Sequence, residues 1–133
     1  MRYLLDTDTI IYIKRGTPRS VVARFRQLAA GEAAISVVAY GELSFGAENS
    51  REKKRNFRVL DALTEVVPVL SLSKKSAEIY GTIRATLERK GRLIGNNDLW
   101  IAAHAMSEDL ILVTNNVREF KRVPGLKIEN WAS

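Results

Sequence analysis

The sequence predicts an α/β fold with a central, mostly parallel β-sheet flanked by helices. Short apolar runs of strand length alternate with longer segments in which apolar residues recur at helical spacing. Strands that alternate with helices in this way usually pair in parallel, because a parallel connection needs a crossover helix. At 133 residues the chain is long enough for one domain, and we expect a single domain over residues 1–133.

Turn residues and apolar periodicity divide the first half of the chain. Tyr3–Leu5 is an apolar strand, and a short helix over Asp8–Lys14 is ended by the break at Arg15-Gly16-Thr17-Pro18. Val21, Val22, Phe25 and Leu28 have helical spacing, which predicts a helix over Ser20–Ala30 that Gly31 ends. The next expected elements are the apolar strand Ala33–Val37, the apolar helix Val38–Ala47 and the polar helix Glu52–Leu63.

The second half repeats this alternation. A valine-rich strand over Val66–Leu70 precedes a helix over Ser73–Lys90, whose apolar residues again have helical spacing. The remaining expected elements are a loop at Gly91–Gly95, a largely buried helix at Asp98–Met106, a strand at Leu110–Thr114 and a final strand region within Val123–Trp131.

Composition limits the possible functions. The chain has no cysteine, so it can form neither a disulfide nor a thiolate metal site. It lacks a stretch of about 18 apolar residues and an N-terminal signal pattern, so we expect a cytoplasmic protein without a membrane segment. The formal charge of +6 favours a polyanionic partner such as nucleic acid, although solvated surface lysines would give the same balance.

Three acidic residues have contexts typical of a catalytic site. Asp6 follows the first strand, at the end where open parallel sheets place their ligands. Glu42 lies within an apolar helix, and Asp98 begins another. Each also has a structural explanation: a turn cap, a solvated helix position and a favourable helix N-terminal charge, respectively. If the three converge, their mutual repulsion requires shared protons or a cation, and oxygen ligands suit Mg²⁺ or Mn²⁺.

The whole chain resembles the PIN-domain ribonucleases, and within them the VapC toxins of type II toxin–antitoxin pairs. The matching segments occur in family order from the first strand to the C-terminus. They are Tyr3-Leu4-Leu5-Asp6-Thr7, Ile35-Ser36 with Glu42-Leu43 and Gly46, Ile94 to Ala105, Leu112 to Asn116, Arg118-Glu119-Phe120, Val123 to Leu126, and Trp131.

This resemblance implies a function and a set of site residues. Asp6, Glu42 and Asp98 match the acidic residues that hold Mg²⁺, with Mn²⁺ as the alternative, for hydrolysis of an RNA phosphodiester. The family's fourth acidic position falls at Asn116, where an amide replaces the carboxylate and adds no charge. Asp8 stands where VapC-like sequences usually have asparagine, as a further ligand or as a turn cap. The resemblance also implies a tRNA substrate, a VapB-like antitoxin covering the acidic site, and a homodimer.

Two other functions fit part of the sequence. Asp6-Thr7-Asp8-Thr9 after a strand also resembles the first motif of haloacid-dehalogenase-like phosphatases, in which Asp6 would be the nucleophile. That family's later lysine and acidic pair are absent from the 19 residues after Thr114, and Glu42 and Asp98 would have no role. The other alternative is a catalytically inactive module that binds RNA or a partner protein.

Some remaining polar residues are secondary candidates. His104 points away from the face that carries Asp98, which favours a structural or surface role for it. The basic residues that we expect to contact phosphate first, unless they are only solvated, are Lys14, Arg15, Arg84, Arg89, Lys90 and Arg92.

Overall fold

A computed structural model describes residues 1–133 and contains one five-stranded sheet in the order β3-β2-β1-β4-β5. All four strand pairings are parallel, which confirms the predicted fold class. The central strand β1 pairs with β2 on one side and with β4 on the other. The strands are β1 Tyr3–Leu5, β2 Ala33–Ser36, β3 Val69–Leu70, β4 Ile111–Val113 and β5 Ile128–Glu129.

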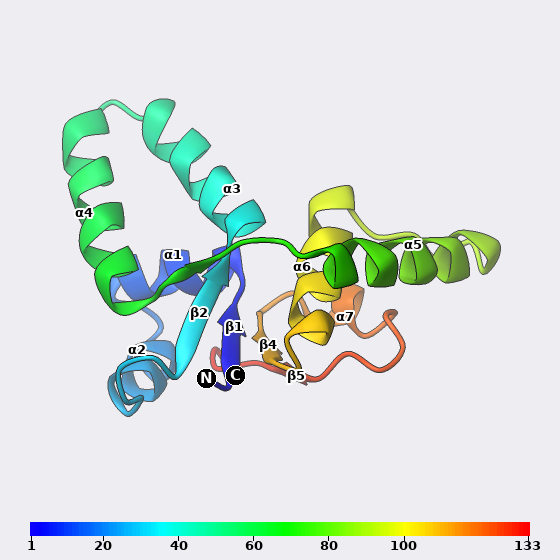
Figure 1. The fold of residues 1–133 in the computed structure, drawn as a ribbon. Coiled ribbons are helices and arrows are strands. Elements are labelled where there is room, and N and C mark those ends of the chain that lie inside the picture. The colour runs from blue at the N-terminus through cyan, green and yellow to red at the C-terminus, as the bar shows by residue number, and fades with distance from the viewer.

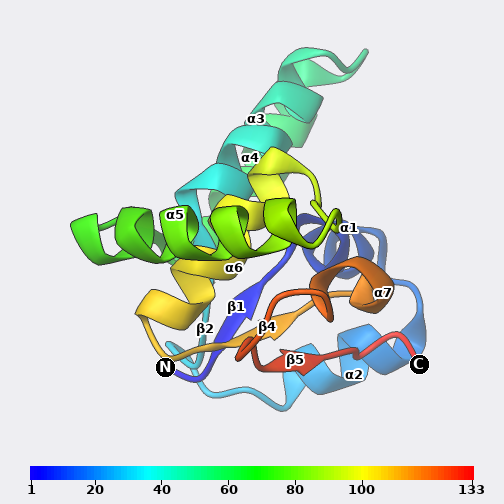
Figure 2. The same cartoon turned by 90° about the vertical axis from the view of Figure 1, so that its right-hand side faces the viewer.

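Seven helices connect these strands and cover the sheet (Figures 1 and 2). They are α1 Thr7–Arg15, α2 Arg19–Arg26, α3 Val37–Glu48, α4 Lys53–Val66, α5 Lys74–Arg89, α6 Asn96–Ser107 and α7 Val117–Phe120. The two helices predicted between the first two strands are both present, as α1 and α2. Gly16 separates them because its left-handed conformation, with φ of 80°, ends α1.

The largest boundary error concerns the predicted strand Val66–Leu70. Helix α4 continues to Val66, and only Val69 and Leu70 pair with β2. The helix continues past the polar residues because Leu60, Leu63 and Val67 recur at helical spacing and are all buried. Valine content alone therefore misplaced the start of this strand.

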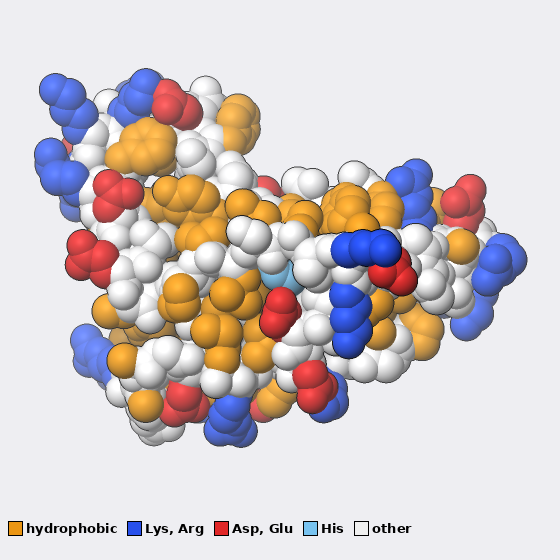
Figure 3. Space-filling model, in the orientation of Figure 1, with side chains coloured by type: hydrophobic (Ala, Val, Ile, Leu, Met, Phe, Trp, Pro, Cys, Tyr) orange, Lys and Arg blue, Asp and Glu red, His pale blue; other side chains and the backbone are white.

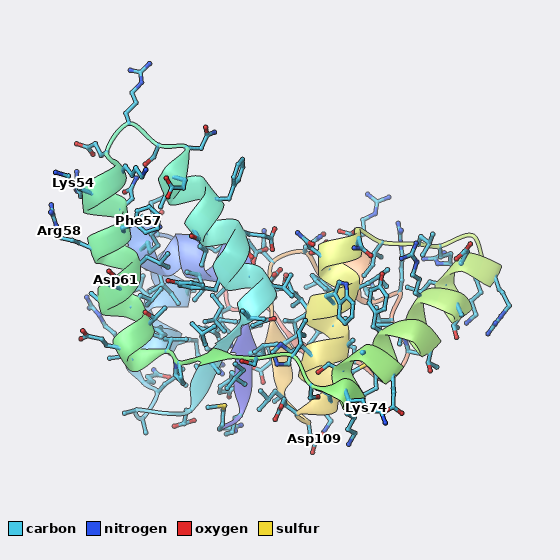
Figure 4. The ribbon with its side chains drawn as sticks, turned by 45° about the horizontal axis from the view of Figure 1, so that its top comes forward. Lys54, Phe57, Arg58, Asp61, Lys74 and Asp109 are labelled. Atoms are coloured by element: carbon cyan, nitrogen blue, oxygen red, sulfur yellow. The ribbon has the colours of Figure 1, made fainter.

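Beyond the sheet, α3 and α4 form one projecting arm and α5 forms another (Figure 1). Phe57 lies on the side of α4 that faces α3, whereas Lys54, Arg58 and Asp61 point away from it (Figure 4). Lys and Arg side chains gather at the outer ends of both arms, and hydrophobic side chains are visible between them (Figure 3). The most exposed large hydrophobic residue is Phe45 of α3, at 70%. None of the helices has the length and apolar character needed to cross a membrane.

The sheet core positions the polar residues at one edge. Leu4, Leu5, Leu112 and Val113 are all fully buried, so β1 and β4 are fixed side by side in the interior. Both strands end at the same edge, because they are parallel and in register. The residues that follow them, beginning with Asp6 and Thr114, therefore meet at the carboxyl edge of the sheet.

Candidate active site

Asp6 is the most buried carboxylate of this edge, with 6% of the residue exposed. It is the N-cap of α1, and one of its oxygens accepts a hydrogen bond from the Thr7 N–H at 2.8 Å. Its other oxygen, Oδ2, accepts a hydrogen bond from the Thr114 hydroxyl at 2.7 Å, across 108 residues of sequence. The ends of β1 and β4 thus fix the orientation of Asp6.

Glu42 approaches the same place from α3. Its Oε1 accepts a hydrogen bond from the Thr7 hydroxyl at 3.0 Å, and Thr7 directly follows Asp6. Glu42 and Thr7 also line a cavity of about 180 Å³ together with Lys14, between α1, α3 and α4. Glu42 is therefore linked to the first turn of α1 and is not merely a solvated helix position.

Asp98 lies in the first turn of α6 and shares a hydrogen bond with the carboxyl group of Glu119, in α7. Glu119 Oε1 also accepts the Gly95 N–H at 3.0 Å, and Glu119 Oε2 accepts a hydrogen bond from the Asn116 amide. Gly95 lies close to this pair, since a Cβ there would be in van der Waals contact with Asp98, 3.5 Å from its Oδ2. The structure thus places a carboxylate, that of Glu119, where the sequence suggested only the amide of Asn116.

Asp8 acts as a turn cap for a distant segment. Its Oδ2 accepts the Asn115 N–H at 3.0 Å, and its Oδ1 accepts the Thr9 hydroxyl at 3.2 Å. The first turn of α1 thereby holds the connection between β4 and α7, which carries Asn116. Of the two roles considered for Asp8, these contacts are those of a turn cap.

The carboxylates perturb one another's ionisation. Burial raises the pKa of Asp6 to about 6, and the negative charges of Asp8 and Glu42 contribute to this rise. Burial likewise raises the pKa of Asp98 to about 7, with additional effects from Asp6, Glu119 and Glu42. The Gly95 N–H lowers the pKa of Glu119, so at neutral pH Glu119 is ionised and Asp98 holds a proton in part.

The donor set fits a hard divalent cation, because carboxylate oxygens are the ligands that Mg²⁺ and Mn²⁺ prefer. In the present arrangement no three His, Cys, Asp or Glu side chains are close enough to hold a metal ion. Each predicted ligand instead makes a hydrogen bond to a neighbour: Asp6 to Thr114, Glu42 to Thr7 and Asp98 to Glu119.

Comparison with known proteins defines the family. The PIN domain family model matches residues 3–126. The chain belongs to the PIN-domain family. Among its relatives, "Ribonuclease VapC2" of Haemophilus influenzae is 44% identical over 131 residues, which cover 98% of each chain. "tRNA(fMet)-specific endonuclease VapC" of Shigella flexneri is 42% identical over 132 residues and 99% of each chain. Within the PIN-domain family the chain is thus one of the VapC ribonucleases.

Solved structures agree with this assignment. The toxin chain in a crystal structure of DNA-bound VapBC from Salmonella typhimurium has a TM-score of 0.92 to this chain and 40% identity, covering 98% of both. VapBC-1 from nontypeable Haemophilus influenzae gives a TM-score of 0.91 and 39% identity over 100% of both chains. PIN-domain ribonucleases depend on divalent metal ions, which agrees with the acidic edge, and neither the phosphatase nor the inactive module is supported.

Glu119 is the residue that sequence reasoning missed as part of the site. It belongs to a four-residue helix, too short for any periodic signal. Its spacing of three residues from Asn116 and its place in the family segment Arg118-Glu119-Phe120 are the signals that could have found it.

The raised pKa of Asp6 predicts that ionisation of this residue lowers the stability of the metal-free protein. Since its pKa is about 6 when folded and 3.8 in the reference state, the folded chain binds more protons between these values. The contribution of Asp6 to stability is therefore most favourable below pH 4 and becomes less favourable as the pH rises through 6. Asp6→Asn should raise the unfolding free energy at pH 8 by about 3 kcal/mol, and the gain should vanish near pH 4. Urea unfolding across this pH range in a chelator checks this; a gain independent of pH would contradict it.

The contact between Asp98 and Glu119 predicts that a substitution at Glu119 changes the pKa of Asp98. Glu119→Gln removes a negative charge beside Asp98, so the pKa of Asp98 should fall by about one unit. The carboxyl ¹³C chemical shift of Asp98, followed by NMR in a metal-free sample, measures this directly. Glu108→Gln, which alters an acid outside the cluster, is the matched control and should leave the titration of Asp98 unchanged.

Proposed function

We propose that this chain is a Mg²⁺-dependent endoribonuclease that cleaves tRNA, and that Asp6, Glu42 and Asp98 hold the ion. The observation that carries the proposal is the convergence of these three residues, which follow β1 or lie on α3 and α6, on one edge, where burial and the neighbouring negative charges raise the pKa of Asp6 and Asp98. A divalent ion relieves that repulsion. When bound, it supplies an activated water and stabilises the negative charge that develops on the phosphate.

The surrounding residues hold the acids in place. Thr7 and Thr114 orient Glu42 and Asp6 through hydroxyl donors. Glu119 keeps Asp98 close to the loop at Gly95 and is itself oriented by Asn116. In this arrangement Asn116 acts on the site through Glu119. Loss of the proton on Asp98 as the ion binds completes the negatively charged site.

The substrate and partner follow from the relatives. The Shigella flexneri relative is named for tRNA(fMet), and we propose initiator tRNA as the substrate of this chain. Because the similar Salmonella and Haemophilus structures are VapBC complexes, we propose that the chain is the toxin of a toxin–antitoxin pair, inhibits translation, and is covered by a VapB-like antitoxin. A homodimer and a cytoplasmic location complete the proposal.

Arg84 is the basic residue best placed to contact the RNA backbone. It is exposed, has no carboxylate partner and donates a hydrogen bond to the Tyr80 hydroxyl at 2.6 Å. The Tyr80 ring stacks on Trp100 of α6 with centroids 3.9 Å apart, which limits the motion of this group. Asn96, at 3.5 Å from Arg84, begins the helix turn that carries Asp98. The guanidinium thus keeps its full charge near the acidic edge, where a polyanion needs a counter-charge.

The metal-ligand assignment predicts loss of cleavage. Asp6→Asn, Glu42→Gln and Asp98→Asn should each cut initiator tRNA at least about 100-fold more slowly with Mg²⁺, because each removes a charged ligand. Gel analysis of end-labelled tRNA measures the rates. Glu48→Gln is the matched control for Glu42, since it lies on the same helix and pairs with Lys53 outside the site. Wild-type rates in all three variants would overturn the assignment.

The Arg84 assignment predicts weaker RNA binding. In an Asp98→Asn background, which prevents cutting, Arg84→Ala should weaken tRNA binding about fivefold and reduce the slope of log affinity against log salt by about one. Fluorescence anisotropy at several salt concentrations gives both values. Arg89→Ala removes an equal charge from the same helix and should change them less; equal losses would mean that only net charge matters.

A further inference from the structure

His104 is the one buried histidine, and the proposed reaction gives it no role. It lies on α6 and is 0% exposed. Its Nδ1 is 2.8 Å from the Ser36 hydroxyl, whereas its Nε2 has no hydrogen-bond partner. An apolar side chain would fill the same space without burying an unpartnered nitrogen. What the imidazole adds is one directional bond between α6 and the start of α3.

Ser36, the residue to which His104 bonds, caps the first turn of α3. Ser36 is the last residue of β2 and the N-cap of α3, and its oxygen accepts the Val38 N–H at 3.2 Å. Burial lowers the pKa of His104, so the ring is neutral at pH 7. Because the Ser36 hydroxyl already accepts one hydrogen bond, its own hydrogen is free for Nδ1, which assigns the ring proton to Nε2.

The bond between His104 and Ser36 lies at the same distance along the helix from each of the two acids Glu42 and Asp98. Glu42 lies six residues after Ser36 on α3, and Asp98 lies six residues before His104 on α6. At 1.5 Å per residue, each acid is about 9 Å along its helix from the bond. Figure 1 shows α3 and α6 both extending past the ends of β1 and β2. A tilt of about 10° in one helix would move its acid by about 1.5 Å, which is large beside the narrow geometry that Mg²⁺ accepts.

We propose that His104 is a positioning residue of the acidic site: its buried bond to Ser36 sets the separation of Glu42 and Asp98 and so the affinity for the divalent ion. The inference rests on the proposed function, in which these acids are ligands. The other hydroxyl contact of α6, between Ser107 and Ser76 at 2.9 Å, joins α6 to α5 and leaves α3 untouched.

Two amide substitutions distinguish the effect of the hydrogen bond to Ser36 from the effect of side-chain volume. The amide of asparagine can occupy the position of Nδ1, whereas the longer glutamine places its amide near Nε2. His104→Asn should therefore keep the bond to Ser36, and His104→Gln should lose it. We expect Mn²⁺ affinity, measured from the EPR signal of the free ion, to fall about five- to tenfold in His104→Gln and less than about twofold in His104→Asn.

Further variants test the bond from its other end. Ser36→Ala should weaken Mn²⁺ binding as His104→Gln does, and the double variant should be no weaker than either single one, since both remove the same interaction. Ser107→Ala is the matched control, because it removes a part-buried hydroxyl bond to α5, and a hydroxyl bond to the His104 backbone carbonyl, without removing the bond between His104 and Ser36. Thermal unfolding without metal should show similar losses of stability in Ser107→Ala and His104→Gln, with the metal affinity of Ser107→Ala unchanged.

The outcomes distinguish this inference from the proposed function. If wild type does not bind Mn²⁺, or if Glu42→Gln and Asp98→Asn bind it as wild type does, the metal assignment fails and the inference fails with it. If those controls behave as expected but His104→Gln and Ser36→Ala bind Mn²⁺ normally, only the inference fails. Equal weakening in Ser107→Ala would also overturn it, because general loosening of α6 would then explain the effect. If His104→Gln does not fold, Ser36→Ala decides.

Discussion

Repulsion between carboxylates at one edge of the sheet is the constraint around which the rest of the structure is organised. Asp6 and Asp98 have raised pKa values because burial and neighbouring acids both oppose their ionisation. The fold nevertheless keeps the acids of this edge in place through fixed donors. Asp6 accepts the Thr114 hydroxyl, Glu42 accepts the Thr7 hydroxyl, and Glu119, the neighbour of Asp98, accepts the Gly95 N–H. The buried apolar strands β1 and β4 make this arrangement rigid, since they fix the positions of the residues that directly follow them.

The order of strands explains why distant segments reach the same edge. With β1 in the centre and every neighbour parallel to it, each strand delivers its following residues to one side of the sheet. Asp6 follows β1 directly, and α3, which carries Glu42, follows β2 without a loop. Asp98 comes from α6, the crossover helix that leads back to β4. Unrelated helices thus meet at one point through sheet topology alone.

Sequence reasoning predicted the fold, which the structure confirms, and proposed three acids for the site, because both leave local signals. Asp6 ends an apolar run, and Glu42 and Asp98 interrupt apolar helices, where a charge requires explanation. Glu119 left no such signal, because its four-residue helix is too short for periodicity and its role depends on contacts with Gly95 and Asp98. For His104, helical geometry gave its direction, away from Asp98, but burial against Ser36 depends on packing between elements 68 residues apart. Pairings of this kind are set by tertiary structure, which single-chain patterns do not contain.

The pairing of β1 with β4 also determines when the site can exist during synthesis. The second strand of the chain to flank β1 is made of residues 111–113, and Asp6 takes its orientation from Thr114, just beyond them. A nascent chain therefore has to release almost its full length from the ribosome before the acids are assembled. A chain that stops before residue 114 therefore lacks both the strand that flanks β1 and the donor that orients Asp6.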